Sequence, residues 1–340
     1  MRATLLALAT GVTVASTVLP VAAATADTVD RTVYGVTSNG NRLVSFPISS
    51  PGSAAPVTPT GTITGLQNAD ERVVGIDFRP ADGKLYALTL GASSGSGNAL
   101  TGTGRIYTVN TTTAVATFVS TLGSNLSGAF YDIGFNPVAN ALRVVSSNGQ
   151  NLRVTNTGGD LSTTVVDTAL SYVDTHAGTA PRVGAVDYTP AAGAATTLYD
   201  LDYAIDVMAV QGAVGGGTGN ASPNSGQLTA IGSAGLGTNV TNLLGFDFTP
   251  EGQGYASGQV FDSSSDGVSD GSMFFSADPT TGKLTPIGME RGDLLDAIAI
   301  DPAAVTPPTA LPEFPLTAAA PLAGLGLLGL LALRRRRRTA

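Results

Sequence analysis

Three aspartates occupy the same position in a repeated phrase of this 340-residue chain, three residues before a proline. They are Asp77, Asp187 and Asp247, and the other two copies of the phrase carry Gly134 and Ala299 there. A ring of such carboxylates could bind a cation, or serve as acid and base. The alternative role is structural: each aspartate accepts hydrogen bonds from turn N–H groups of its own or the neighbouring repeat. We favour the structural role, because a catalytic pair rarely needs the same position in successive repeats.

A second acidic segment offers side-chain oxygens at alternating positions, with Gly267 at the sixth position. This spacing resembles the start of an EF-hand-like calcium loop. The candidate calcium ligands are Asp262, Ser264, Asp266 and Asp270. The twelfth position is Met273, where such a loop needs a bidentate glutamate, so a solvated hairpin tip between two strands is the alternative. Calcium is the only cofactor that the sequence suggests.

The chain contains one histidine and no cysteine. The lack of cysteine excludes disulfides, thiolate zinc sites, iron–sulfur clusters and cysteine nucleophiles. His176 has Asp174 nearby, but no serine sits in a Gly-x-Ser-x-Gly elbow, so we expect an ordinary surface histidine. The sequence therefore supplies no catalytic set.

Arginines stand out because cations are scarce, with 17 Lys+Arg against 25 Asp+Glu and a net charge of -8. This balance excludes a basic nucleic-acid-binding surface. Four arginines could converge on an anionic ligand, or each could neutralise a neighbouring aspartate, which the acid excess favours. These arginines are Arg79, Arg143, Arg153 and Arg182.

The repeated phrase is a short apolar strand followed by a proline and a turn. Its five copies end at prolines that are separated by 57, 53, 60 and 52 residues, namely Pro80, Pro137, Pro190, Pro250 and Pro302. Self-similarity at about 50 residues is typical of propellers and solenoids. Each interval holds three further strand-like runs, and four strands per repeat make the blade of a propeller.

The last repeat stops after Pro302, while three strand-like runs precede the first copy. Those runs are Thr32–Thr37, Arg42–Pro47 and Thr60–Thr64. We predict that the C-terminal strand completes the blade that the N-terminus begins, which leaves no long unpaired edge. The predicted fold is an all-β propeller of five four-stranded blades. Six blades, through a missed repeat in Gly212–Thr241, is the alternative.

The two ends of the chain differ from the body. An apolar stretch after Arg2 leads to Ala24 and Ala26, which fit the rule for cleavage by signal peptidase, so we predict a signal peptide over 1–26. A Pro/Ala-rich linker over 303–313 precedes an apolar stretch over 314–333 that is long enough to be a transmembrane helix. The Arg-rich tail over 334–340 should remain cytoplasmic, which places the propeller, residues 27–302, outside the cell.

The C-terminal junction resembles the prokaryotic PEP-CTERM and PEF-CTERM sorting signals. The resemblance rests on a short motif followed by an apolar helix and an arginine run, and the motif residues are Pro312, Glu313, Phe314 and Pro315. It implies recognition by an exosortase-like or archaeosortase-like protease, cleavage near the motif and attachment to the cell surface. A plain single-pass membrane anchor is the alternative.

The body resembles the bacterial family called domain of unknown function 4394 over about residues 32–302. The phrases that carry the resemblance are Gly75–Pro80, Gly134–Pro137 with Leu142–Val144, Gly149–Val154, Thr197–Tyr199, and Pro223–Gly226 with Leu228. The family pattern typically has Asn where this chain has His176, which counts against a catalytic histidine. The resemblance implies a secreted repeat protein without an established activity.

The function that we predict is a binding or display module on the cell surface, with an unknown extracellular ligand. One alternative is a secreted hydrolase or lyase that uses carboxylates at the mouth of the propeller channel. Another is a structural component of the cell coat. Convergence of the three repeated aspartates on an open pocket, with raised pKa values, would favour the enzyme.

Overall fold

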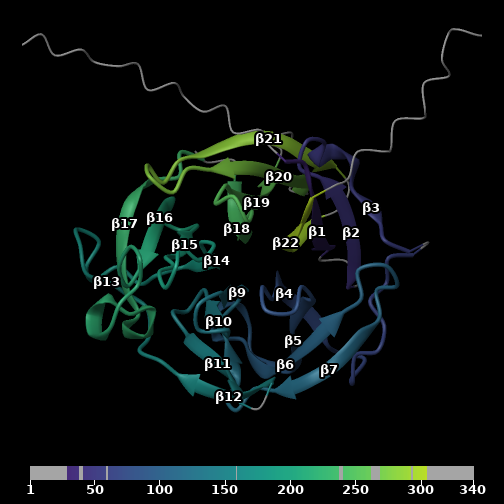
Figure 1. Cartoon of the computed structure of the whole chain (residues 1–340), viewed down its shortest axis with the longest axis horizontal. Coiled ribbons are helices and arrows are strands. Elements are labelled where there is room, and N and C mark those ends of the chain that lie inside the picture. The colour runs from purple at the N-terminus through teal and green to yellow at the C-terminus, as the bar shows by residue number, and fades with distance from the viewer. Residues whose placement is uncertain are drawn as a thin grey trace, which may run out of the picture.

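The computed structural model describes residues 29–304, except 38–40, 59, 158, 237–239, 262–268 and 292–293. The described residues form five β-sheets arranged in a ring (Figure 1). This is a five-bladed β-propeller, as predicted. The segment 212–241 contributes strand residues to two of the five sheets and forms no sheet of its own among the described residues, so the six-bladed alternative is wrong.

Each blade is numbered from the one that contains the N-terminal strands. Blade 1 contains β22 (Leu295–Ala304), β1 (Arg31–Thr37), β2 (Arg42–Pro47) and β3 (Ala55–Pro56). Blade 2 contains β4 (Arg72–Phe78), β5 (Leu85–Ser94), β6 (Thr101–Val109) and β7 (Ala116–Thr121), with β8 (Leu126–Ser127) paired to β6. Blade 3 contains β9 (Tyr131–Asn136), β10 (Ala141–Ser146), β11 (Asn151–Thr157) and β12 (Asp160–Val166).

The last two blades follow in chain order. Blade 4 contains β14 (Val183–Tyr188), β15 (Leu198–Asp202), β16 (Val207–Gln211), β17 (Gln227–Ser233) and the short parallel strand β13 (Ser171–Tyr172). Blade 5 contains β18 (Val240–Phe248), β19 (Gly254–Phe261), β20 (Ser269–Ala277) and β21 (Leu284–Arg291). Short 3-10 helices lie in the connections, namely η1 (Pro51–Ser53), η2 (Gly97–Ala99), η3 (Gly219–Ala221) and η4 (Pro223–Ser225).

The ring closes through blade 1, where the C-terminal strand β22 pairs antiparallel with β1. Val33 lies opposite Ile300 and Tyr34 lies opposite Ala299. The predicted closure is therefore confirmed, and the five sheets form an unbroken ring (Figure 1).

The outermost strand of blade 1 is displaced from its predicted place. We expected it at Thr60–Thr64, but β3 lies at Ala55–Pro56 and pairs with β2. The later residues form only isolated bridges, because Thr62 bridges to Arg42 while Thr64 bridges to Val115 of blade 2. Gly61, with a φ of 65° that glycine adopts readily, lies between β3 and Thr62, and the chain passes from blade 1 to blade 2 between Thr62 and Thr64.

Apolar side chains fill the junctions between neighbouring blades. The described residues contain five clusters of buried apolar side chains, one at each junction. At the junction of blades 2 and 3, for example, Leu88 and Ile106 pack with Leu142 and Leu152. Each sheet is thus covered on both faces, which explains why β14 is buried along its whole length.

Several predictions fall on residues that the structure does not describe. The signal peptide with Ala24 and Ala26, the sorting motif at Pro312 to Pro315, the apolar stretch 314–333 and the tail 334–340 all lie outside the described residues. Within the described part of the chain, no helix is both long and apolar enough to span a membrane.

Candidate functional site

The inner strands of blades 2, 4 and 5 bring the three repeated aspartates together. Asp77 lies on β4, Asp187 on β14 and Asp247 on β18, and one oxygen of each carboxylate lies within 4.8 Å of the others. The side chains are buried, with exposed fractions of 4–6% for the three residues. The inner strands surround the centre of the ring, so equivalent positions in distant repeats meet there (Figure 1).

Each of these carboxylates accepts a backbone N–H from the next blade that follows in the ring. The Oδ2 atom of Asp77 accepts from Phe135 at 2.6 Å, and that of Asp187 accepts from Phe248 at 3.0 Å. The Oδ2 atom of Asp247 accepts from Ile300 at 2.5 Å. The carboxylates therefore join successive blades, although the donors are strand N–H groups and not the turn N–H groups that we expected.

A fourth carboxylate, Asp132, completes this pattern in blade 3 and was missed in the sequence. It is buried, and its Oδ2 atom accepts the N–H of Val186 at 3.0 Å. In blade 2 the inner strand reads Gly75-x-Asp77, whereas in blade 3 it reads Asp132-x-Gly134. The exchange of Asp and Gly across two positions is the signal that could have revealed it.

The exchange also has a steric reason. A Cβ atom at Gly134 would lie 2.9 Å from Asp187 Oδ1 and 3.0 Å from Asp187 Cα. Real Cβ atoms rarely tolerate contacts this short, so only glycine allows β9 and β14 to approach this closely. Gly134 thereby makes room for the Asp187 carboxyl group at the centre of the ring.

Burial raises the pKa of all three repeated aspartates. The pKa of Asp247 rises to about 6. The pKa values of Asp77 and Asp187 lie well above their ordinary range, first because of burial and then because of the charge on Asp247. The side-chain interaction between Asp187 and Asp247 raises the pKa of Asp187 and lowers that of Asp247, as expected when two neighbouring carboxyl groups compete for one proton. Near neutral pH, the group therefore does not carry three negative charges.

The three aspartates line a cavity of about 350 Å³. Its lining includes the motif proline of every repeat, namely Pro80, Pro137, Pro190, Pro250 and Pro302. Four aromatic residues that directly follow the repeated position also line it, namely Phe78, Phe135, Tyr188 and Phe248. The central cavity, as we call it, thus has an apolar wall and a polar floor made of Asp77, Asp187 and Asp247.

The floor of the central cavity could accept a positively charged group. Three carboxylate oxygens this close would repel one another when ionised, and a cation would relieve that repulsion. Calcium takes 6–8 oxygen ligands, so waters or a ligand in the cavity would have to supply the rest. An ammonium group of an organic ligand satisfies the same charge with fewer contacts.

The model of the family described as "Domain of unknown function (DUF4394)" matches residues 42–299, more than half of the chain. The chain belongs to this family. The match runs from the start of β2 into β22, so the DUF4394 region takes in strands of all five blades. No curated protein matches the chain.

Two solved structures are similar to this DUF4394 chain over part of its length. One is described as the structure of the Dos1 propeller, with 7% sequence identity and a TM-score of 0.37 over 69% of this chain and 65% of that chain. The other is an auxiliary nutrient binding protein from Bacteroides ovatus ATCC 8483, with 14% identity and a TM-score of 0.38 over 67% of this chain and 53% of that chain. The alignments thus cover less than two thirds of either structure.

The candidate calcium loop of the DUF4394 chain lies mostly outside the described residues. Asp262, Ser264 and Asp266 fall in the segment 262–268, and Asp270 belongs to β20. The strands that flank this segment, β19 and β20, pair antiparallel with Phe261 opposite Ser269. The calcium prediction therefore stays a prediction.

His176 lies away from the lining of the central cavity. Its Nδ1 atom is 3.1 Å from Asp174 Oδ1, and its ring centroid is 5.4 Å from that of Tyr172. The imidazole side chain is one third exposed. These contacts describe a partly exposed histidine that is held by a neighbouring carboxylate.

The four arginines do not converge on one point. Arg79 contacts Asp82 and the Tyr86 hydroxyl, and Arg182 donates to the carbonyl of Ser147. Arg143 and Arg153 differ from these two, because both bind the carboxylate of Asp167.

Proposed function

We propose that this DUF4394 chain is a binding module of the cell surface and that its ligand occupies the central cavity. The observation that carries the proposal is the cavity lining, which combines the motif proline of all five repeats with the three carboxylates. Each repeat thus contributes its proline, the residue that recurs in all five copies of the phrase, to one site. An apolar cavity with a few converging polar groups is the usual form of a ligand site.

The chemistry of the cavity suits a ligand that carries a positive charge on an apolar body. The charged group, a metal ion or an organic ammonium, would contact Asp187 and Asp247 in place of the proton between them. The apolar body would pack against the prolines and the rings of Tyr188 and Phe248. Because the incoming charge displaces a proton, binding should strengthen as the pH rises.

A carboxylate-dependent hydrolase or lyase is the second candidate. It is favoured by the contact between Asp187 and Asp247 and by the pKa of Asp247 at about 6, since general acids and bases work best near the ambient pH. Against it, Asp77, Asp187 and Asp247 each accept a backbone N–H from the next blade. Because those bonds already account for the carboxylates as parts of the fold, we place binding first.

Export and anchoring are part of the same proposal and rest on the terminal segments of the sequence. Signal peptidase would cleave after Ala26, and the apolar stretch 314–333 would hold the chain in the membrane until an exosortase-like or archaeosortase-like enzyme acts. Expression in a bacterial host with such an enzyme tests this. Recovery of mature chains that begin at Asp27, at the cell surface, is expected. Retention of the uncleaved chain in the cytoplasm would contradict it.

Calorimetric titration of the purified chain tests the central cavity. The probes are calcium chloride, magnesium chloride and tetramethylammonium chloride, each at about pH 7.5 and about pH 5, on either side of the raised pKa values. We expect at least one probe to bind at the higher pH and to bind more weakly at the lower pH. The Asp187→Asn variant should lose this binding.

The matched control is Asp160→Asn, since Asp160 is an exposed aspartate outside the cavity lining. It should bind like the wild type. Failure of every probe, or equal binding by the Asp187→Asn variant, would overturn the cation site. Whether calcium or tetramethylammonium binds distinguishes a metal from an organic ammonium ligand.

A further inference from the structure

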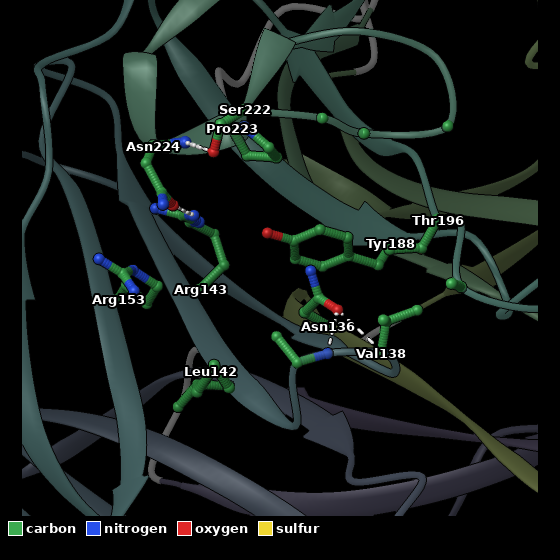
Figure 2. Close-up of a pocket in the computed structure, with 16 residues that line it drawn as sticks. Asn136, Val138, Leu142, Arg143, Arg153, Tyr188, Thr196, Ser222, Pro223 and Asn224 are labelled. Atoms are coloured by element: carbon green, nitrogen blue, oxygen red, sulfur yellow. Dashed lines mark hydrogen bonds between the residues drawn. The ribbon is translucent and has the colours of Figure 1, made fainter. Parts of the chain in front are cut away.

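A second cavity, of about 230 Å³, lies between blades 3 and 4 (Figure 2). Residues of β10 and β11 line one side, and Tyr188, the glycine segment 215–217 and the segment 222–224 line the other. We call it the inter-blade cavity. Arg143 and Arg153 belong to its lining, and none of the described residues that line it is acidic. This is unusual in a chain with 25 acidic and 17 basic residues.

The two arginines leave a net positive charge beside the cavity. Asp167 pairs with Arg143 at 2.8 Å and with Arg153 at 3.2 Å, so one carboxylate serves two guanidinium groups. The carboxyl group of Asp200 lies near Arg143, but burial raises its pKa well above the ordinary value, which favours the uncharged form. One positive charge is therefore left over.

The two arginines have different roles. Arg143 is buried and also donates to the side-chain oxygens of Asn151 and Asn224, both at 2.7 Å, so its guanidinium is held in place. The side chain of Arg153 is 30% exposed, and it reaches Asp167 through Nε and Nη2 only. Its Nη1 group has no acceptor among the described residues, which leaves it able to bind a ligand.

The amide side chains of the lining also present donors. The Oδ1 atom of Asn136 accepts the N–H groups of Val138 and Ala139, at 2.9 and 2.8 Å. Its Nδ2 atom is therefore the free end, and it points toward the ring of Tyr188 (Figure 2). Asn224 likewise uses its Oδ1 atom for Arg143, so its Nδ2 group remains as a donor.

The glycine segment forms a wall without side chains. Gly215 and Gly216 have φ values of 78° and 71°, a backbone region that other residues rarely adopt. A ligand can therefore approach the backbone at this point. Together with the amide and guanidinium groups, this wall makes a small cavity that is rich in hydrogen-bond donors.

We propose that the inter-blade cavity binds a small ligand through an oxyanion group, a carboxylate or a phosphate. Guanidinium and amide N–H groups suit such oxygens, and Arg153 supplies the charge. The volume of about 230 Å³ corresponds to roughly eight waters at about 30 Å³ each, which fits a small organic acid or phosphate. This site is separate from the cation site proposed above, although Tyr188 lines both cavities.

Titration of the purified chain with sodium phosphate, succinate and glucuronate, at low ionic strength and neutral pH, tests this proposal. Binding of phosphate alone identifies a phosphate ligand, and binding of succinate or glucuronate identifies a carboxylate. The affinity should fall as sodium chloride is added, because the Arg153 side chain is partly exposed and salt screens its charge. If none of the three probes binds, the proposal is wrong.

Two variants locate the binding. Arg153→Gln should weaken it about tenfold or more, because a hydrogen bond to a charged group is lost while the buried pair of Arg143 and Asp167 remains. Asn136→Asp keeps the oxygen that accepts from Val138 and Ala139 but replaces a donor by a negative charge, so it should also weaken binding.

Arg182→Gln is the matched control, since it removes the same charge outside the cavity lining and should bind like the wild type. Melting curves should show that each variant is folded. Unchanged affinity in a folded Arg153→Gln or Asn136→Asp variant would overturn the proposal.

Discussion

The carboxylate of Asp187 accepts the backbone N–H of Phe248 at 3.0 Å, across 61 positions of the sequence. This bond joins the inner strand of blade 4 to that of blade 5, and Asp77 and Asp247 make the same kind of bond at other junctions. The same three side chains form the floor of the central cavity. One set of carboxylates therefore holds blades together and supplies the negative charge that a ligand would meet.

The first prediction concerns pH and the Asp187→Asn variant. The amide can still accept from Phe248 and can donate to Asp247, so it imitates the protonated form of Asp187. An acid with a raised pKa stabilises the fold below its unfolded pKa, near 4, and that stabilisation is lost as the pH rises through the folded value. For Asp247 that folded value is about 6.

The wild-type free energy of unfolding should therefore fall between about pH 4.5 and pH 7.5, by roughly 1–3 kcal/mol from these groups. The free energy of unfolding of the Asp187→Asn variant should fall less over this range, so the variant should be the more stable protein at the higher pH. Urea unfolding at several pH values measures both, with Asp160→Asn as the control. Parallel curves for the wild type and the Asp187→Asn variant would contradict the prediction.

The second prediction concerns the close approach of β9 and β14. Gly134→Ala would place a Cβ atom 2.9 Å from Asp187 Oδ1 and 3.0 Å from its Cα atom, so the strands must move apart. Such overpacking should cost about 1–3 kcal/mol of stability. It should also weaken any binding that depends on Asp187.

The matched control is Gly123→Ala, because a Cβ atom there would lie 3.6 Å from its nearest neighbour, Thr164. That distance is an ordinary contact, so the free energy of unfolding of this variant should lie within about 0.5 kcal/mol of the wild-type value. Chemical denaturation of both variants measures the difference. Equal stabilities would show that the inner strands have more room at Gly134 than the structure indicates.

The third prediction concerns Glu71, a buried carboxylate at the start of blade 2. Burial works to raise its pKa, but hydrogen bonds from several side chains and the charge of Arg105 outweigh burial, so the pKa lies below the ordinary value. Its partners are Asn68, Thr89, Tyr107 and Arg105. Glu71→Gln should destabilise the protein by about 3 kcal/mol near neutral pH, because a buried ion pair loses one partner.

Glu251→Gln provides the comparison, since Glu251 pairs with Arg31 but its side chain is 48% exposed. Water reaches the Glu251 carboxylate, so the loss should be smaller than that of the Glu71→Gln variant. Because the pKa of Glu71 is lowered, its contribution should disappear as the pH falls below about 4. If the two variants lost a similar free energy of unfolding at neutral pH, the prediction would be wrong.

Much of the fold could be predicted from the sequence because a propeller blade is a local unit. A strand was predicted at Arg42–Pro47 and β2 occupies those residues, since a short run of apolar and β-branched residues defines a strand locally. The pairing of β1 with β22 could also be predicted, because one repeat lacked the strands that the other end supplied. The segment 60–64 was mispredicted because its pairing is divided between two blades.

Only part of the candidate site could be predicted from the sequence. Equal positions in a repeat pointed to Asp77, Asp187 and Asp247, but Asp132 was missed because it had exchanged positions with Gly134. Nothing in the local sequence near Arg143 and Arg153 indicates that Asn136 and Asn224, 88 positions apart, line the same cavity. Those contacts depend on how blades 3 and 4 pack against each other.

The sequence by itself therefore determined the repeat, the strands, the closure of the ring and the three aspartates that belong to equivalent positions. These properties follow from local patterns and from a period of about 50 residues. Only the tertiary structure decided that the aspartates lie within 4.8 Å of one another, and that each also bonds to the next blade. The physical reason is that closing the ring forces the inner strands together. Side chains from distant repeats therefore lie in one buried volume, where the charge on one aspartate raises the pKa of its neighbours.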